Sequence, residues 1–245
     1  VYIVSWLFAL AVSFVSCDDW LDKTPKDRLY PDVYFKTEDE LRLFTNQFYN
    51  NLVPSAVDIY SESSDLIVKS DLMLEMSGQR IIPDEGNGWN FTALRDINFY
   101  LQYSHNCTEV NARNRYDGVA RFFRAYFYFE KVKRYGDIPW YDKALDSDDP
   151  ELYKARDSRE FVMQKMLEDL DFAIANLPKT KNAYVLTRWT ALALKSRVCL
   201  FEGTFRKYHG LEDYEKYLNA CVSASETFMN ESGYTLYKSG STPYR

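Results

Sequence analysis

The chain has 245 residues, of which 46% are hydrophobic and 17% aromatic, and it carries a formal net charge of −6. The hydrophobic share is close to that of average globular domains, so the composition excludes a disordered protein. The acidic balance argues against a nucleic-acid partner, because that affinity rests on basic side chains that contact phosphates. The many aromatic residues are expected to serve mainly the packing of helices.

The N-terminal segment predicts a targeting signal. Its first 14 residues are almost wholly apolar, which suits a secretory core and falls short of the roughly 20 residues that span a membrane. Ser16 directly precedes Cys17, which is the order of a bacterial lipobox. We therefore predict a signal peptide at 1–16, a lipidated N-terminus at Cys17 and an acidic, water-facing tether at 17–36. The alternative is that Cys17 is a buried structural cysteine.

Two helices are predicted in the first half of the chain. Thr37 and Glu40 have the spacing of a capping box, and apolar residues follow at helical spacing until Pro54. Residues 55–88 combine polar runs with a stretch rich in Pro and Gly, which is typical of a loop. A second helix is predicted at about 91–104, where apolar residues again share one face.

The strongest helical pattern covers about 110–135. Its bulky residues, among them Phe122 and Phe123, predict one wide aromatic face. Gly136 and Pro139 then supply the stop signals of this helix. A long loop is expected before the next helix.

Three more helices are predicted in the rest of the chain, at about 158–177, 188–206 and 212–229. Asp157 with Glu160 forms a capping pattern for the first of them, and Thr187 is the expected cap of the second. Helices of this length with short connections predict stacked antiparallel pairs. The predicted fold class is therefore all-α, an α-solenoid-like scaffold of tetratricopeptide-like antiparallel helix pairs with irregular loops.

Patterns typical of catalytic and metal sites are absent from the sequence. His105 and His209 have no metal-ligand spacing and are expected at exposed helix ends, and no nucleotide-binding or hydrolase signature occurs. The acids at 146–151 lack the spacing of a calcium loop, so we predict a solvated loop there. No C-x-x-C pair occurs, although a bridge between Cys199 and Cys221 on neighbouring helices stays open. We therefore expect no cofactor and no metal.

Three separate segments resemble a known family. They are SCDDWLDKTP at 16–25, ARFFRAYFYFEKVKRYGDIPWYDKAL at 120–145 and LTRWTALALKSRVCLFEG at 186–203. Their order and spacing resemble the N-terminal half of the SusD/RagB-family nutrient-binding lipoproteins. Family members continue well beyond this length, so residues 37–245 are expected to form a SusD-like N-terminal helical domain that is incomplete at its C-terminus.

The resemblance implies a binding protein and not an enzyme. It implies a surface-facing lipoprotein, held in the outer membrane by a lipid anchor, that captures glycans or peptides. It also implies a partner, a SusC-like TonB-dependent transporter, to which the ligand is delivered.

The resemblance also implies ligand-binding residues. Trp89 stands just before a predicted helix, where the family often carries an aromatic residue that serves as a sugar platform. Arg80, Asn87 and Asn90 are then the expected hydrogen-bonding partners of the sugar hydroxyls. The alternative is that Trp89 simply packs at the start of its helix.

Two other functions stay open at this point. A tetratricopeptide-type adaptor would bind a peptide segment of another protein in its helical groove. A surface glycoside hydrolase would hide its two catalytic carboxylates among the 36 acidic residues of the chain. Cytoplasmic location without lipidation would favour the adaptor, and release of reducing ends from a polysaccharide would favour the hydrolase.

Overall fold

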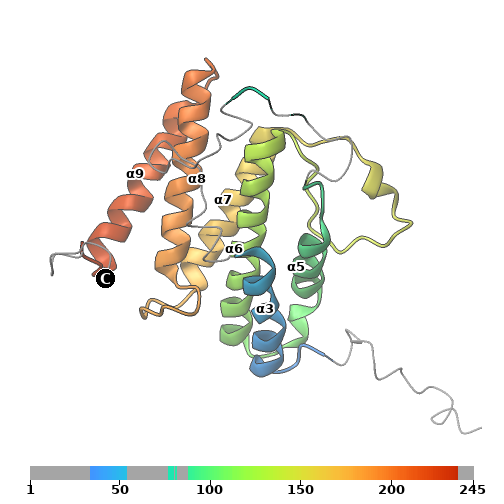
Figure 1. Cartoon of the computed structure of the whole chain (residues 1–245). Helices are drawn as coiled ribbons and strands as arrows, with labels where there is room; N and C mark the ends of the chain where they lie inside the picture. Colours follow the sequence, from blue (N-terminus) through green and yellow to red (C-terminus); the bar gives the residue numbers. More distant parts are fainter. Residues whose placement is uncertain (1–33, 54–76, 80, 82–87, 237–245) are drawn as a thin grey trace, which may run out of the picture. The chain divides into compact units, whose positions relative to one another are not determined.

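The computed structural model describes residues 34–53, 77–79, 81 and 88–236 (Figure 1). The chain divides into two units, Val1–Tyr34 and Phe35–Arg245, and all the described helices belong to the second unit. The predicted signal peptide, Cys17 and most of the predicted tether lie outside the described residues. The predicted domain boundaries therefore stay predictions.

The described part of the chain is all-helical, as predicted. Its α-helices are α3 (Glu38–Leu52), α5 (Thr92–Tyr103), α6 (Val110–Tyr135), α7 (Arg159–Asn176), α8 (Arg188–Tyr208) and α9 (Tyr214–Glu231). Two short 3-10 helices, η2 (Ser104–Asn106) and η3 (Pro150–Tyr153), follow α5 and precede α7. All the helices predicted from periodicity are present, with bounds within a few residues of those expected. None of these described helices combines the length and the hydrophobicity needed to cross a bilayer.

Two of the predicted helix caps are confirmed. The Thr37 hydroxyl accepts a hydrogen bond from the Glu40 amide at 3.3 Å, and the Glu40 carboxylate accepts one from the Thr37 amide at 3.1 Å. Thr187 caps α8 with Thr190 in the same reciprocal arrangement. These bonds satisfy amide groups that have no partner within the first turn of a helix.

The predicted cap of α7 is wrong by one position. Ser158 is the N-cap, and its hydroxyl accepts a hydrogen bond from the Phe161 amide at 3.3 Å. The Asp157 carboxylate instead accepts a hydrogen bond from the Trp140 amide at 2.7 Å. Asp and Ser cap helices equally well, so the choice between these neighbours depends on a contact 17 residues away.

Helix α6 occupies the centre of the second unit and contacts α3, α5, α7 and α8 (Figure 1). The prediction of a single aromatic face was therefore too narrow, because α6 is buried on several sides. Its buried residues include Tyr116, Val119, Phe122, Phe123, Phe127, Tyr128, Phe129 and Val132. A helix with neighbours on several sides buries more than the single apolar stripe of a surface helix.

Consecutive helices from α6 to α9 form antiparallel pairs, as predicted. A Cβ atom on Gly118, near the start of α6, would lie 3.4 Å from Leu177, just after α7 ends. Helices α8 and α9 are joined by the short segment 209–213 and pack along each other. Gly203 allows this approach, since a Cβ there would lie 2.7 Å from Cδ2 of Leu218.

A buried carboxylate joins the ends of α7 and α8. Glu202 is fully buried and accepts hydrogen bonds from Nε of Arg159 at 2.7 Å and Nε of Arg206 at 2.8 Å. Arg206 also contacts Glu160, whose carboxylate accepts a hydrogen bond from the Tyr217 hydroxyl of α9 at 3.2 Å. The buried carboxylate of Glu202 is therefore balanced by the cations Arg159 and Arg206, as a buried charge requires.

Three cysteines and both histidines lie within the described residues. Cys107, Cys199 and Cys221 are free thiols, so the alternative of a Cys199–Cys221 bridge is not realised. Burial raises the pKa of Cys199 to about 12, which keeps the thiol protonated and unreactive. His105 and His209 are exposed beside the ends of helices, as predicted.

Candidate ligand-binding site

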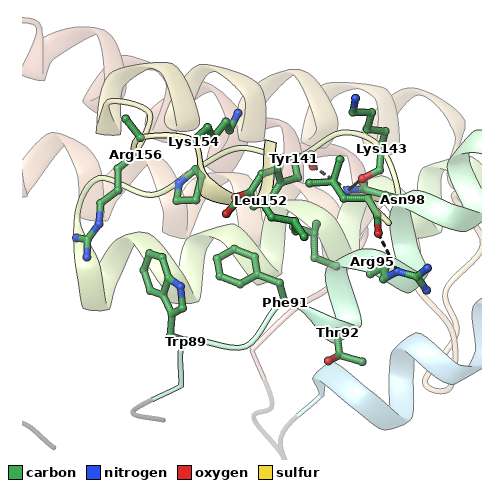
Figure 2. A pocket seen from close by; sticks show the side chains of 14 residues that line it. Trp89, Phe91, Thr92, Arg95, Asn98, Tyr141, Lys143, Leu152, Lys154 and Arg156 are labelled. Atoms are coloured by element: carbon green, nitrogen blue, oxygen red, sulfur yellow. Dashed lines mark hydrogen bonds between the residues drawn. The ribbon is translucent and has the colours of Figure 1, made fainter. Parts of the chain in front are cut away.

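A pocket of about 530 Å³ opens between the start of α5 and the segment 139–156, as Figure 2 shows. Its apolar wall is formed by Trp89, Phe91, Leu94, Pro139, Tyr141, Leu145 and Leu152. Four cationic residues also line it, namely Arg95, Lys143, Lys154 and Arg156. Mostly apolar walls with a few convergent polar groups are typical of small-molecule sites.

Trp89 stands at the rim of this pocket and is 42% exposed. Its indole packs nearly perpendicular to the rings of Phe91, at 5.3 Å between centroids, and Tyr135, at 4.9 Å. The guanidinium carbon of Arg156 lies 4.9 Å from the centre of the Trp89 ring. Trp89 therefore packs at the helix start and also remains open to solvent, and its role as a sugar platform stays a prediction.

Asn90 does not join Trp89 in the wall of the pocket. Asn90 is exposed, and its side-chain oxygen accepts a hydrogen bond from the Thr92 amide at 2.8 Å. This bond shapes the entry to α5 and is typical of an asparagine turn. Arg80 and Asn87 lie outside the described residues. Their roles as ligand partners stay predictions.

The far wall of the pocket is held by a buried asparagine of α5. Nδ2 of Asn98 donates hydrogen bonds to the carbonyl oxygens of Tyr141 at 2.8 Å and Lys143 at 3.3 Å. Its Oδ1 accepts a hydrogen bond from Nη1 of Arg124 at 3.2 Å. Asn98 also lines the pocket, and its three hydrogen bonds position the wall.

A tyrosine of α6 fixes the same wall from behind. The Tyr128 hydroxyl accepts a hydrogen bond from the Tyr141 amide at 2.6 Å and donates one to the Pro139 carbonyl at 3.3 Å. Its ring stacks on Trp140 with 4.2 Å between centroids. Burial raises the pKa of Tyr128, so its phenol stays neutral and keeps these bonds at any physiological pH.

Lys154 holds the end of the segment 139–156 against its start. Nζ of Lys154 donates a hydrogen bond to the Trp140 carbonyl at 2.6 Å and pairs with Asp157 at 3.0 Å. The Tyr141 hydroxyl donates to the Leu152 carbonyl at 3.3 Å. The sequence did not reveal the two hydrogen bonds to carbonyls, because they join residues 11 and 14 positions apart within a loop that has no helical or strand period.

The acids at 146–151 form the solvated turn that was predicted. Most of them are exposed, and Asp149 caps η3 by accepting a hydrogen bond from the Glu151 amide at 2.9 Å. Within the described ranges no group of three or more histidine, cysteine or acidic side chains is placed to hold a metal ion.

The chain is similar to known proteins in sequence and in fold. A family model described as "Starch-binding associating with outer membrane" (SusD-like_2) matches residues 48–188, more than half of the chain. SusD-like protein P2 of Formosa agariphila is 27% identical over 218 residues, which cover 81% of this chain and 43% of that protein. The chain spans about two fifths of the length of the curated relatives it matches.

Solved structures show the same fold. Bacteroides fragilis NanU superimposes with a TM-score of 0.65 at 19% identity, over 87% of this chain and 46% of that chain. A SusD-like carbohydrate binding protein from Bacteroides vulgatus gives a TM-score of 0.58 at 15% identity, over 82% of this chain and 46% of that chain. The described helices thus share the tetratricopeptide-like scaffold of these neighbours. With the family match over residues 48–188, the chain belongs to the SusD-like family.

Proposed function

We propose that this chain is a surface-exposed, lipid-anchored protein of the outer membrane that binds glycans or other nutrients. It delivers them to a SusC-like TonB-dependent transporter. The observation that carries the proposal is the pocket beside Trp89, because it sits on the scaffold of a family described as starch-binding and associated with the outer membrane. One structural neighbour is named a carbohydrate binding protein, which supports the same ligand class.

The lining of the pocket suits a saccharide. Three aromatic rings, those of Trp89, Phe91 and Tyr141, offer flat apolar surfaces to the apolar faces of sugar rings. Cationic side chains at the rim supply hydrogen-bond donors for hydroxyl oxygens. The volume of about 530 Å³ lies within the range of roughly 300 to 1,000 Å³ that is usual for ligand pockets.

The wall of the pocket is preorganised. Asn98 and Tyr128 hold the backbone of Tyr141 and Lys143 through three hydrogen bonds of 3.3 Å or less. A wall that is already ordered loses little conformational entropy when a ligand binds. This favours capture of a ligand from dilute solution.

Binding without catalysis is the better fit to this pocket. A glycoside hydrolase needs two carboxyl groups about 5 to 10 Å apart that flank the scissile bond. The lining residues in the described part of the chain include no aspartate or glutamate. The pocket therefore supports a role in capture and transfer.

The membrane anchor can be tested separately. Cys17 is the proposed lipidation site, with the signal peptide at 1–16 and the tether at 17–36. Cys17→Ala should move the chain from the membrane fraction to the aqueous fraction of the host cell. Retention of the Cys17→Ala variant in the membrane fraction would refute lipid anchoring at this residue.

Calorimetry of the purified chain against a panel of oligosaccharides and peptides tests the ligand site. Trp89→Ala should weaken binding by about tenfold or more, as removal of a central aromatic contact commonly does. Trp89→Phe should retain part of the affinity, because it keeps an aromatic face. Tyr184→Ala is the matched control, since that ring is 89% exposed and does not line the pocket. Unchanged binding by a folded Trp89→Ala variant would exclude this pocket as the site.

A further inference from the structure

The pocket gathers positive charge in an otherwise acidic protein. The chain has a formal net charge of −6, yet the charged residues that line the described pocket wall are all cations. They are Arg95, Lys143, Lys154 and Arg156. These cations can select a negatively charged ligand only if neighbouring acids do not already neutralise them.

Both lysines are already engaged by neighbouring acids. Lys143 pairs with Glu151 at 3.0 Å and with Asp149 at 3.7 Å. Lys154 pairs with Asp157 at 3.0 Å and also donates to a backbone carbonyl at 2.6 Å. These pairs neutralise much of the lysine charge, so the lysines shape the loop more than they attract an anion.

Arg95 is partly engaged. Its Nε donates a hydrogen bond to the Leu145 carbonyl at 3.2 Å, and its Nη2 lies 3.9 Å from the exposed carboxylate of Asp146. This long, exposed ion pair screens the Arg95 charge only weakly. Figure 2 shows Arg95 at the end of the pocket opposite Trp89 and Arg156.

Arg156 differs from the other three cations. It is exposed, and no carboxylate in the described part of the chain lies within ion-pair distance of it. Its guanidinium carbon lies 4.9 Å from the centre of the Trp89 ring, and Figure 2 shows the two side chains at the same end of the pocket. The Arg156 guanidinium makes no hydrogen bond to a described residue, so its N–H groups remain able to donate to a ligand.

We infer that Arg156 and Trp89 form a subsite for the carboxylate or sulfate group of an acidic saccharide. The planar guanidinium edge would donate paired hydrogen bonds to two oxygens of the acidic group. The sugar ring that carries this group would lie against the exposed part of Trp89 and the neighbouring Phe91. Arg95, at the opposite end, would attract a second acidic unit of the same chain.

This inference rests on the proposed glycan-binding function and narrows its ligand to one chemical class. Among the described acids, Asp157 pairs with Lys154 and Glu151 pairs with Lys143, and none forms an ion pair with Arg156. A neutral saccharide would gain only hydroxyl contacts from Arg156. An acidic saccharide would gain a bidentate pair of hydrogen bonds between opposite charges.

Calorimetry with matched saccharide pairs tests the subsite. The probes are oligogalacturonate with its methyl ester, a sulfated galactan oligosaccharide with its desulfated, neutral form, and a neutral xylogluco-oligosaccharide. We expect the acidic member of at least one pair to bind about tenfold more tightly than its partner at low salt, and this preference to shrink as salt rises. Sensitivity to esterification identifies a carboxylate as the bound group, and sensitivity to desulfation identifies a sulfate.

Variants assign the preference to Arg156. Arg156→Gln should abolish the acidic preference, because acidic and neutral members then meet the same uncharged side chain at this position. Arg197→Gln removes the same charge from an exposed position on α8 away from the pocket and should change nothing. Equal binding of acidic and neutral members, with Trp89→Ala weakening both, would overturn the inference and leave the proposed function standing. Absence of binding to every probe by the folded wild-type chain would overturn both.

Discussion

Arg124 of α6 and Asp169 of α7 form a bidentate ion pair inside the protein. Nε of Arg124 lies 2.6 Å from Oδ2 of Asp169, and Nη2 lies 2.8 Å from Oδ1. The two side chains are only 9% and 3% exposed. Because Arg124 also donates to Asn98, this pair links the helix core to the wall of the pocket.

Asp169→Ala should be strongly destabilising, because it leaves Arg124 buried without its partner. Loss of one member of a buried ion pair costs about 3 to 5 kcal/mol. Asp171→Ala is the matched control on the same helix, since Asp171 is 59% exposed and pairs with Lys195. The control should cost at most about 1 kcal/mol. Urea denaturation measures both values, and equal effects of the two substitutions would contradict this account of the core.

Gly203→Ala should separate α8 from α9. A Cβ at this position would lie 2.7 Å from Cδ2 and 2.8 Å from Cγ of Leu218, so one helix must shift. Overpacking of this kind costs about 1 to 3 kcal/mol, and adding Leu218→Ala should recover part of the loss. The melting temperatures of the single and double variants test this.

Gly118→Ala provides the opposite case. The nearest atom to a Cβ at Gly118 would be Cγ of Leu177 at 3.4 Å, which is an ordinary contact. Because alanine favours a helix over glycine by about 1 kcal/mol, this variant should be neutral or slightly stabilised. A loss of stability equal to that of Gly203→Ala would show that contact distance does not decide the sign.

The helices were predictable because their signals are local. The Thr37–Glu40 and Thr187 caps and the apolar periods each lie within one turn or one helix, and the structure places helices where these patterns predict them. The prediction of Asp157 as the cap of α7 was wrong because the position of this side chain is not decided locally. Its carboxylate is taken by the Trp140 amide, a contact that depends on how the loop folds back.

Among the residues that line the pocket, the sequence predicted only Trp89. Trp89 stands out in the sequence as an aromatic residue before a helix, but its neighbour Arg156 is 67 positions away. The wall at 139–145 depends on Asn98, which is more than 40 positions from the backbone it holds and looks like any polar residue of a helix. Contacts of such long separation leave no periodic trace in the sequence.

Asp117 should make stability depend on pH. Burial raises the pKa of this carboxyl, which lies near the buried Tyr100 on α5. The folded state therefore holds a proton more tightly than the unfolded state, so stability should rise as pH falls from the raised folded pKa toward the unfolded value of about 3.9. Asp117→Asn should lack this increment and be at least as stable as the wild type at pH 7.

Thermal unfolding between pH 7 and pH 4 checks this sign. The difference in melting temperature between Asp117→Asn and the wild type should narrow or reverse as pH falls. Asp96→Asn is a useful comparison, because burial also raises the pKa of Asp96. A gap between wild type and Asp117→Asn that stays constant over this range would show that Asp117 has an ordinary pKa.

Tyr128→Phe should weaken ligand binding although Tyr128 does not line the pocket. Without the hydroxyl, the buried Tyr141 amide loses the acceptor that lies 2.6 Å away, and an unsatisfied buried donor costs about 1 to 3 kcal/mol. The wall at Tyr141 should then exchange its amide hydrogen faster and bind saccharides less tightly. Tyr126→Phe is the matched control on the same helix, because Tyr126 is only half-buried and does not line this pocket. Amide hydrogen exchange together with calorimetry separates the two effects. Faster exchange with unchanged affinity would mean that the ligand does not rest on this wall.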